Sequence, residues 1–386
     1  MRGSLKLFTW FGIPVHIHWT FGLIFVYAIW IGYDNNLDVS GTLWLMGFFI
    51  ALFLCVLLHE YGHSLTARRY GVETKDIILT PIGGIARLER MPEKPIQEFL
   101  VAIAGPLVNV AIAIILFGAS MLIFTGERWE LFQWFLQNQL TFSGGEETGE
   151  VMEESGIGMS SLLFYLPVLV ATNIGLVVFN MIPAFPMDGG RIFRSLLAMR
   201  IGRVQATKWA SWLGQSIAVF FILFGLWQNA FTLAIIGFFV FTTARSENTM
   251  VQLDDLLRRF KASDLMRPQF TRLNISDWMQ TPIELIKQGL ERHFLVFDMS
   301  DRLVGALEED AIVAAMKKHD TSAEVGRYIQ RVEVVRPDES LQYIFYLLRQ
   351  RGDSIIGVGD ETIGLVGVID DTGLQHFLRL QAGAVR

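Results

Sequence analysis

The chain has 386 residues, of which 52 % are apolar and 18 % are charged, whereas soluble proteins carry about 25 % charged residues. Residues 1–245 hold 31 charged side chains and residues 246–386 hold 39, so the first part has the composition of a membrane protein and the second that of a soluble domain. A net charge of −6 without a basic run argues against a nucleic-acid partner. A single cysteine, Cys55, excludes an internal disulfide framework.

Six apolar stretches are predicted to cross the bilayer as helices, which takes about 20 residues each. Lysine and arginine are alternately frequent and rare in the segments that connect these stretches, which predicts that both termini are cytoplasmic. The basic, amphipathic segment Arg191–Gly202 is expected to lie along the membrane interface. The six stretches are Pro14–Tyr33, Leu43–Thr66, Gln97–Phe124, Ser160–Ile182, Ala206–Trp227 and Ala230–Ala244.

The polar tail contains two segments with the same order of features, Ala262–Lys318 and Glu324–Arg379. Each begins with an apolar strand-like run near a proline, continues with a helical stretch and short strands around a turn, and closes with a helix. Similarity at a period of about 60 residues indicates a tandem repeat. The sequence therefore predicts a transmembrane domain (1–245), a linker (246–261) and two modules (262–320 and 321–386).

The second apolar stretch contains the sequence His59-Glu60-Tyr61-Gly62-His63. Residues four apart lie on one face of a helix, so both imidazoles can bind one ion while Glu60 lies beside it. Zinc accepts such nitrogen ligands, and a carboxylate outside the ligand set can take the proton of a zinc-activated water. Ionisable groups near a helix end can also simply reach out to water, but their cost inside a span favours a metal site.

Two histidines are too few for such a site, so a third ligand is expected from another part of the chain. The fourth stretch ends where Pro183 and Pro186 interrupt the helix, and Asp188 follows with two glycines after it. Asp188 is predicted to lie at the cytoplasmic side of the membrane, as the histidine pair does. This agreement favours ligation over a simple Asp-Gly-Gly turn, with one divalent ion per chain.

These motifs resemble those of the site-2 protease family of intramembrane zinc metalloproteases. The resemblance rests on His59-Glu60-x-x-His63 within an apolar helix and on Asn180-x-x-Pro183-x-x-Pro186-x-Asp188-Gly189-Gly190 downstream. Two further patterns agree, Ala104-Gly105-Pro106-x-x-Asn109 and Gly12-Ile13-Pro14-Val15. The tail resembles a pair of CBS modules, so the whole chain is similar to the bacterial subgroup that carries such a pair behind its membrane core.

The resemblance implies that His59, His63 and Asp188 bind Zn²⁺ and that Glu60 is the general base. It implies a polytopic α-helical membrane protein with six transmembrane helices and a membrane-associated β-hairpin, followed by a cytoplasmic α/β CBS-pair domain. The implied activity is that of a metalloendopeptidase in the bacterial cytoplasmic (inner) membrane. Such an enzyme would cleave a membrane-anchored protein substrate within or near its transmembrane segment, and the CBS pair would regulate it.

The segment between the second and third stretches, residues 76–90, is predicted to form a β-hairpin bent at Gly83 and Gly84. Its edge could hold an unwound substrate by strand addition, and an interfacial loop is the alternative.

Asn180 and Asn109 are polar residues within apolar stretches. Either could stabilise the oxyanion or hold the substrate backbone, and a hydrogen bond between helices is the alternative, favoured for Asn109.

CBS pairs often bind adenine nucleotides and dimerise, so the resemblance implies a homodimer here. Glu308 and Asp370 replace neutral residues of the usual ribose-binding pattern and would repel phosphate, so a nucleotide ligand stays an open question. Two other functions also stay open. The chain could be an ion transporter or channel gated by the CBS pair, or a metal-dependent scaffold without catalysis.

Overall fold

The computed structural model describes residues 3–81, 83–141, 161–289, 291–360 and 364–384. It divides into two compact units, Met1–Thr249 and Met250–Arg386, and each unit has buried apolar clusters of its own. The division falls within helix α9 (Phe231–Arg259), close to the position where the density of charged residues changes. Composition and packing therefore divide the chain at nearly the same place.

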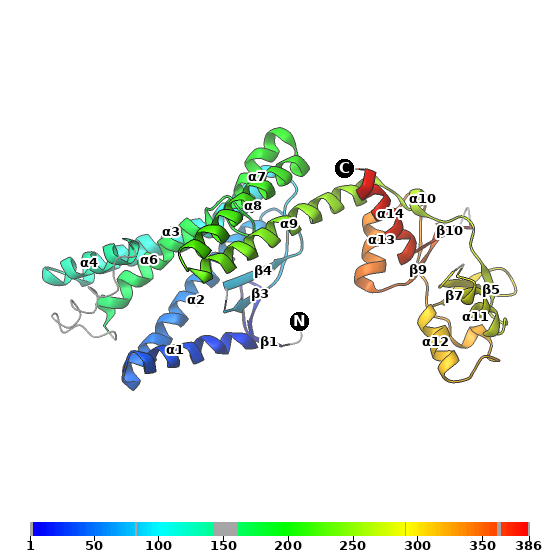
Figure 1. Ribbon diagram of the computed structural model, residues 1–386, viewed down its shortest axis with the longest axis horizontal. Coiled ribbons are helices and arrows are strands. Elements are labelled where there is room, and N and C mark those ends of the chain that lie inside the picture. Colours follow the sequence, from blue (N-terminus) through cyan, green and yellow to red (C-terminus); the bar gives the residue numbers. More distant parts are fainter. Residues whose placement is uncertain (1–2, 82, 142–160, 290, 361–363, 385–386) are drawn as a thin grey trace. The chain divides into compact units, whose positions relative to one another are not determined.

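Within the described residues of the first unit, four helices are long and apolar enough to cross a membrane (Figure 1). They are α2 (Val39–Arg68), α3 (Pro95–Ile123), α6 (Leu162–Asn180) and α8 (Arg203–Trp227). These helices correspond to the second, third, fourth and fifth stretches predicted from the sequence. The prediction of six spans is thus supported for four of them within the described part of the chain.

The first predicted span, Pro14–Tyr33, is not one continuous helix. Its beginning belongs to strand β2 (Ile13–His18), and helix α1 covers only Gly22–Asp34. Thirteen helical residues extend about 20 Å, which is less than the roughly 30 Å of a bilayer core. The sixth predicted span, Ala230–Ala244, forms the apolar half of α9, whose second half is charged.

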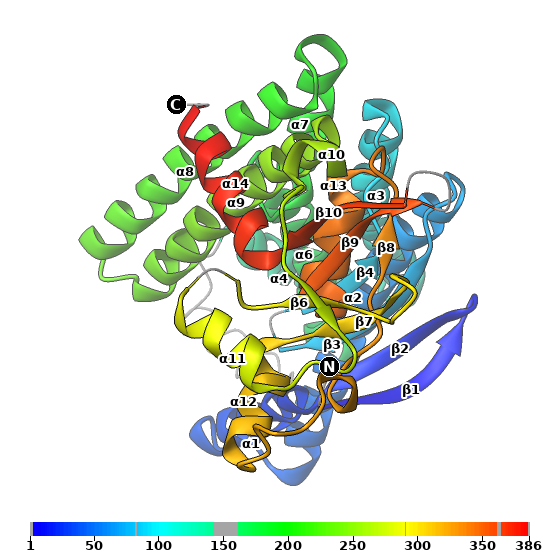
Figure 2. The same ribbon diagram turned by 90° about the vertical axis from the view of Figure 1, so that its right-hand side faces the viewer.

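A four-stranded sheet lies beside these helices, with the strand order β1-β2-β3-β4. Its other strands are β1 (Ser4–Trp10), β3 (Thr74–Thr80) and β4 (Gly83–Leu88). The pairs β1–β2 and β3–β4 are antiparallel hairpins, whereas β2 and β3 pair in parallel because α1 and α2 connect them. Figure 2 shows the long β1–β2 hairpin in blue. The sequence predicts neither β1 nor β2.

The β3–β4 hairpin bends before the two glycines rather than at them. Gly83 and Gly84 are the first residues of β4 and pair with Thr80 and Leu79. One face of the sheet contributes Ile77 and its neighbours to a buried cluster with α2. The sheet is thereby fixed against the helix that carries the histidine motif.

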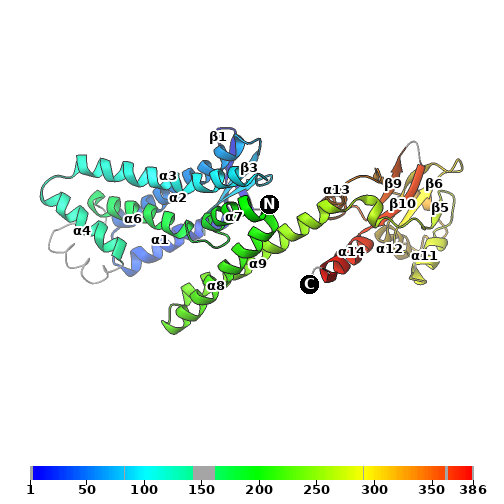
Figure 3. The same ribbon diagram turned by 90° about the horizontal axis from the view of Figure 1, so that it is seen from above.

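Helix α3 is central to the first unit. It packs against α2, α6 and α7 (Asp188–Ile201), and α8 packs in turn against α7 (Figure 3). Helix α4 (Glu127–Thr141) follows α3 and packs against α6 through buried aromatic side chains such as Phe132. The sequence predicts a connecting loop here, because polar residues interrupt the apolar ones too often for a membrane span.

The second unit begins with the end of α9 and the short helix α10 (Ala262–Leu265) and contains two three-stranded sheets of identical topology. In each sheet the first strand is parallel to the second, and the second is antiparallel to the third. The first half comprises β5 (Arg272–Asn274), α11 (Gln280–Lys287), β6 (Phe294–Phe297), β7 (Leu303–Leu307) and α12 (Glu309–Lys317). The second comprises β8 (Val334–Val335), α13 (Leu341–Tyr346), β9 (Ile355–Asp360), β10 (Gly364–Asp370) and α14 (Asp371–Ala384).

Candidate metal centre

Three potential ligand atoms converge between helices α2 and α7. The Nε2 atoms of His59 and His63 are 3.0 Å apart, and Oδ2 of Asp188 lies 3.2 Å from the first and 3.1 Å from the second. All three residues are buried, with at most 7 % of their surface exposed. The structure therefore brings together the three residues that the sequence singles out, although Asp188 is 125 positions from His63.

The backbone of α3 orients one of the two imidazoles. Nδ1 of His63 lies 2.7 Å from the carbonyl oxygen of Val101, and because a carbonyl can only accept, Nδ1 carries the proton. The Nε2 atom of the neutral ring is then left with a lone pair for an ion. A hydrogen bond of this kind commonly fixes the tautomer of a metal-binding histidine. The sequence gives no signal for Val101, because its contribution is a backbone atom.

Helix α3 approaches the imidazoles more closely than any side chain would permit. A Cβ atom built on Gly105 would lie 2.2 Å from Nε2 of His63 and 2.7 Å from Nε2 of His59. Real Cβ atoms essentially never approach another heavy atom below 3.0 Å, so this position requires glycine. Gly105 belongs to a motif noted in the sequence, but its direct contact with the ligand atoms is visible only in the structure.

Asp188 is held by the interrupted segment between α6 and α7. It is the first residue of α7, and the buried residues Ala184, Phe185 and Met187 precede it. Burial opposes the charge of Asp188, but the two imidazoles next to its carboxylate outweigh this effect and hold the pKa of its carboxyl below the usual range. The carboxylate is therefore ionised at neutral pH, as a metal ligand must be.

The geometry and chemistry of this donor set fit zinc. Ligand atoms about 2.0–2.1 Å from a tetrahedral ion lie roughly 3.3 Å from one another, close to the separations of 3.0–3.2 Å found here. Two imidazole nitrogens and one carboxylate oxygen form a three-ligand set of the kind that leaves a fourth position open in catalytic zinc sites. Other divalent ions accept the same ligands, so the donor set alone does not select zinc.

Glu60 lies beside the three ligand residues without belonging to them. Its Oε2 accepts a hydrogen bond from the backbone N–H of Ala86 in β4 at 3.1 Å. A Cβ atom on Gly84 would lie 2.6 Å from Cγ of Glu60, so β4 passes directly over this carboxylate. Strand β4 is also the last strand of the sheet. The arrangement places a carboxylate, a sheet edge and a candidate metal site next to one another.

The other residues predicted from the sequence, Asn180, Asn109 and Gly83, do not belong to the group of three ligand atoms. Asn180 is the partly exposed last residue of α6, eight positions before Asp188. Asn109 is 1 % exposed and lies one helical turn after Gly105. Neither atom of its side-chain amide has a hydrogen-bond partner among the described residues, so the expected bond between helices is not found there. Gly83 begins β4 with a φ of 142°.

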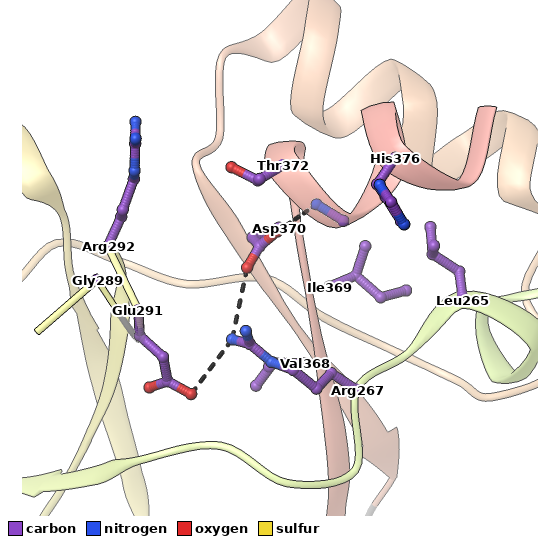
Figure 4. A pocket seen from close by; sticks show the side chains of 11 residues that line it. Leu265, Arg267, Gly289, Glu291, Arg292, Val368, Ile369, Asp370, Thr372 and His376 are labelled. Carbon is purple, nitrogen blue, oxygen red and sulfur yellow. Dashed lines mark hydrogen bonds and ion pairs between the residues drawn. The ribbon is translucent and has the colours of Figure 1, made fainter. Parts of the chain in front are cut away.

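The second unit contains a pocket of about 320 Å³ that is lined by residues of both of its halves. Arg267 lies in this pocket, with its Nη2 atom 3.3 Å from Oε1 of Glu291 and 3.5 Å from Oδ2 of Asp370 (Figure 4). A phosphate would meet a guanidinium that two carboxylates already neutralise. Arg292 is a second arginine in the lining of this pocket, so the pocket does not decide whether an adenine nucleotide binds.

Comparison with known proteins agrees with the geometry of the first unit. The model of peptidase family M50 matches residues 47–226. A zinc metalloprotease of Methanocaldococcus jannaschii is 30 % identical, and the match covers 99 % of this chain and 98 % of the relative. The match therefore extends over both units of the chain.

The chain is also similar to proteins of known structure. The site-2 protease from Methanocaldococcus jannaschii is 34 % identical over 64 % of this chain and 95 % of its own, with a TM-score of 0.43. A hemolysin-like protein of Oenococcus oeni that contains a CBS domain is 17 % identical over 33 % of this chain and 95 % of its own, with a TM-score of 0.30. On the strength of the nearly full-length relative, the chain belongs to the M50, or site-2 protease, family and is a metalloendopeptidase.

Proposed function

We propose that this chain is a zinc-dependent intramembrane endopeptidase that cleaves a membrane-anchored protein within or near its transmembrane segment. The observation that carries the proposal is the convergence of His59, His63 and Asp188 around one point, with two of them on a helix that is apolar enough to span a bilayer. Ionisable groups are costly at such a depth and are by default functional. Family membership favours this activity over an ion transporter.

Each residue of the site would have its own role in peptide hydrolysis. When bound, zinc would supply an activated water and polarise the scissile carbonyl. Glu60 would take the proton of the attacking water and then deliver it to the departing amine. Val101 and Gly105 keep the imidazole of His63 oriented and close to its partners. General base catalysis of this kind contributes about 10²- to 10⁴-fold to the rate.

The edge of β4 is the proposed binding place for the substrate. A transmembrane helix hides its peptide bonds within its own hydrogen bonds, so it must unwind locally before water can attack. The N–H of Ala86 is directed at Glu60, which places the outer edge of β4 on the side of the proposed general base. A substrate strand added to this edge would pass beside Glu60, and Gly83 and Gly84 would let its backbone come close.

Asn180 and Asn109 are proposed as donors to the oxyanion or to the substrate backbone. Asn109 supports this role because its amide is buried and has no partner among the described residues, and because it lies on the same face of α3 as Gly105. A buried amide without a partner costs free energy. Binding of a substrate carbonyl would satisfy that amide.

The repeated second unit is proposed to be a cytoplasmic CBS pair that regulates the protease and mediates a homodimer. Its two halves have the same β-α-β-β-α order, which supports an origin by duplication. The alternation of basic residues supports cytoplasmic termini in a bacterial inner membrane.

The function is tested with the purified full-length chain in detergent and a candidate single-pass membrane substrate. Glu60→Gln should keep its zinc and lose cleavage by about 10²- to 10⁴-fold, whereas Glu73→Gln, which changes an exposed side chain, should behave like the wild type. Equal cleavage by the wild type and Glu60→Gln would contradict the proposal.

Two other outcomes would favour the alternative functions. If neither protein cleaves, and if Glu60→Gln has no effect in cells while His63→Ala has one, the metal-dependent scaffold is favoured. Ion flux in vesicles that His59→Ala abolishes would favour a transporter.

A further inference from the structure

A buried ion cluster of three side chains lies in the first unit, apart from the three ligand atoms. Arg194, in α7, is completely buried. Its Nε donates to Oε1 of Glu98 at 2.8 Å, and its Nη2 donates to the same oxygen. Its Nη1 donates to Oε1 of Glu247, in α9, at 2.5 Å. One guanidinium therefore joins α3, α7 and α9.

Stability alone is a weak reason for such a cluster. Removing charges from water costs several kcal/mol per ion, and apolar replacements of buried ion pairs are often neutral or stabilising. A guanidinium that is bonded to two carboxylates nevertheless fixes directions as well as distances. The cluster is therefore better suited to setting the relative position of helices than to strengthening the fold.

Two of the helices that Arg194 joins, α3 and α7, take part in the candidate metal centre. Glu98 lies in the first turn of α3, three residues before Val101, whose carbonyl orients His63. Arg194 lies six residues after Asp188, or about 9 Å further along α7 at 1.5 Å per residue. The pair of Arg194 and Glu98 thus ties the helix that orients one ligand to the helix that begins with another.

Arg194 also contacts the segment that leads to Asp188. Its guanidinium carbon lies 5.0 Å from the centre of the Phe185 ring, within the range of a cation–π interaction. Phe185 is 2 % exposed and precedes Asp188 by three residues. Arg194 therefore constrains Asp188 in two ways. It lies in the helix that follows Asp188, and it contacts Phe185 in the segment that precedes Asp188.

We infer that Arg194 is a positioning residue which, with Glu98 and Phe185, sets the Asp188 carboxylate against the two imidazoles. Glu247 adds a contact from α9 and contributes less, because its side chain is 35 % exposed. This inference rests on the proposed metal site. Partners behind metal ligands typically change metal affinity or activity by about 10- to 100-fold when mutated.

The test measures metal binding, so it needs no substrate. The full-length chain in detergent is stripped of metal and titrated with Co²⁺, whose visible absorption reports the geometry of its ligands, and zinc is then added as a competitor. Arg194→Lys and Glu98→Gln should weaken Co²⁺ binding about 10- to 100-fold and alter the visible spectrum. Glu247→Gln should have the same effect to a smaller degree. Arg200→Gln, an exposed arginine of the same helix, is the matched control and should leave affinity and spectrum unchanged.

Thermal unfolding of each variant separates positioning from folding. Glu247→Gln removes only the partly exposed partner, so it keeps the test valid if the other two variants fail to fold. Variants that fold and bind Co²⁺ with the affinity and spectrum of the wild type would overturn the inference. If the wild type itself binds neither Co²⁺ nor zinc, the proposed metal site fails first, and the two failures are thus distinguishable.

Discussion

Replacement of Gly105 by alanine would place a methyl group among the proposed ligand atoms. The added carbon would lie 2.2 Å from Nε2 of His63, and ordinary contacts begin at 3.4 Å, so the imidazole or the helix must retreat by about 1.2 Å. Metal sites tolerate deviations of about 0.2 Å in their ligand distances. Gly105→Ala is therefore expected to reduce zinc affinity by at least about 100-fold, although Gly105 is not itself a proposed ligand.

The effect of Gly105→Ala on stability should be much smaller. Overpacking costs about 1–3 kcal/mol, while alanine gains about 1 kcal/mol over glycine within a helix, which leaves a net loss of about 0–2 kcal/mol. The assay compares zinc per chain, by elemental mass spectrometry, with the unfolding midpoint by circular dichroism. Gly118→Ala in the same helix, where no atom lies within 4 Å of the added carbon, is the control. A Gly105→Ala protein with a full complement of zinc would refute the close approach.

Three further outcomes are expected. Gly84→Ala should keep zinc but slow cleavage at least about tenfold, because its Cβ would lie 2.6 Å from Cγ of Glu60; unchanged kcat would contradict the contact. Hydrogen bonds from Arg87 hold the pKa of Asp76 below its usual range, so Asp76→Asn should cost about 1 kcal/mol at pH 7 in thermal unfolding. That difference should begin to shrink as the pH falls below about 4 and should disappear only below the lowered pKa of Asp76. Burial lowers the pKa of His293, so the second unit should lose stability as the pH falls below about 6.5, and His293→Gln should flatten this dependence in denaturant titrations.

Local patterns in the sequence predict which three residues come together at the candidate metal centre. The spacing of His59 and His63 places both on one face of a helix whatever the tertiary structure. Asp188 could be predicted from the broken helix before it and from its expected side of the membrane. The repeat in the tail could be predicted because each half shows the same order of local signals.

The features that the sequence misses depend on contacts between distant segments. In Ile13–His18 the residues Ile13, Val15 and Ile17 alternate with a proline and two histidines, which is the period of a strand. The run has only six residues and leads directly into an apolar stretch, so the sequence favours its inclusion in the predicted span; its pairing with β1 and β3 shows that it is a strand. Glu98 and Arg194 read as ordinary charges of loops or helix ends, and nothing local indicates that they meet in a buried cluster. Gly105 belongs to a motif that the sequence shows, but nothing local indicates that it lies against the two imidazoles.

In the proposed site, two imidazoles and one carboxylate share a single hydrolytic ion. X-ray absorption at the zinc edge, on the full-length chain loaded with one zinc ion, tests this arrangement most directly. Nitrogen and oxygen ligands are expected at about 2.0–2.1 Å with two imidazoles, and Asp188→Ala is expected to lose its bound zinc. A sulfur ligand at about 2.3 Å, which only Cys55 or a methionine could provide, or full zinc binding by Asp188→Ala, would contradict it.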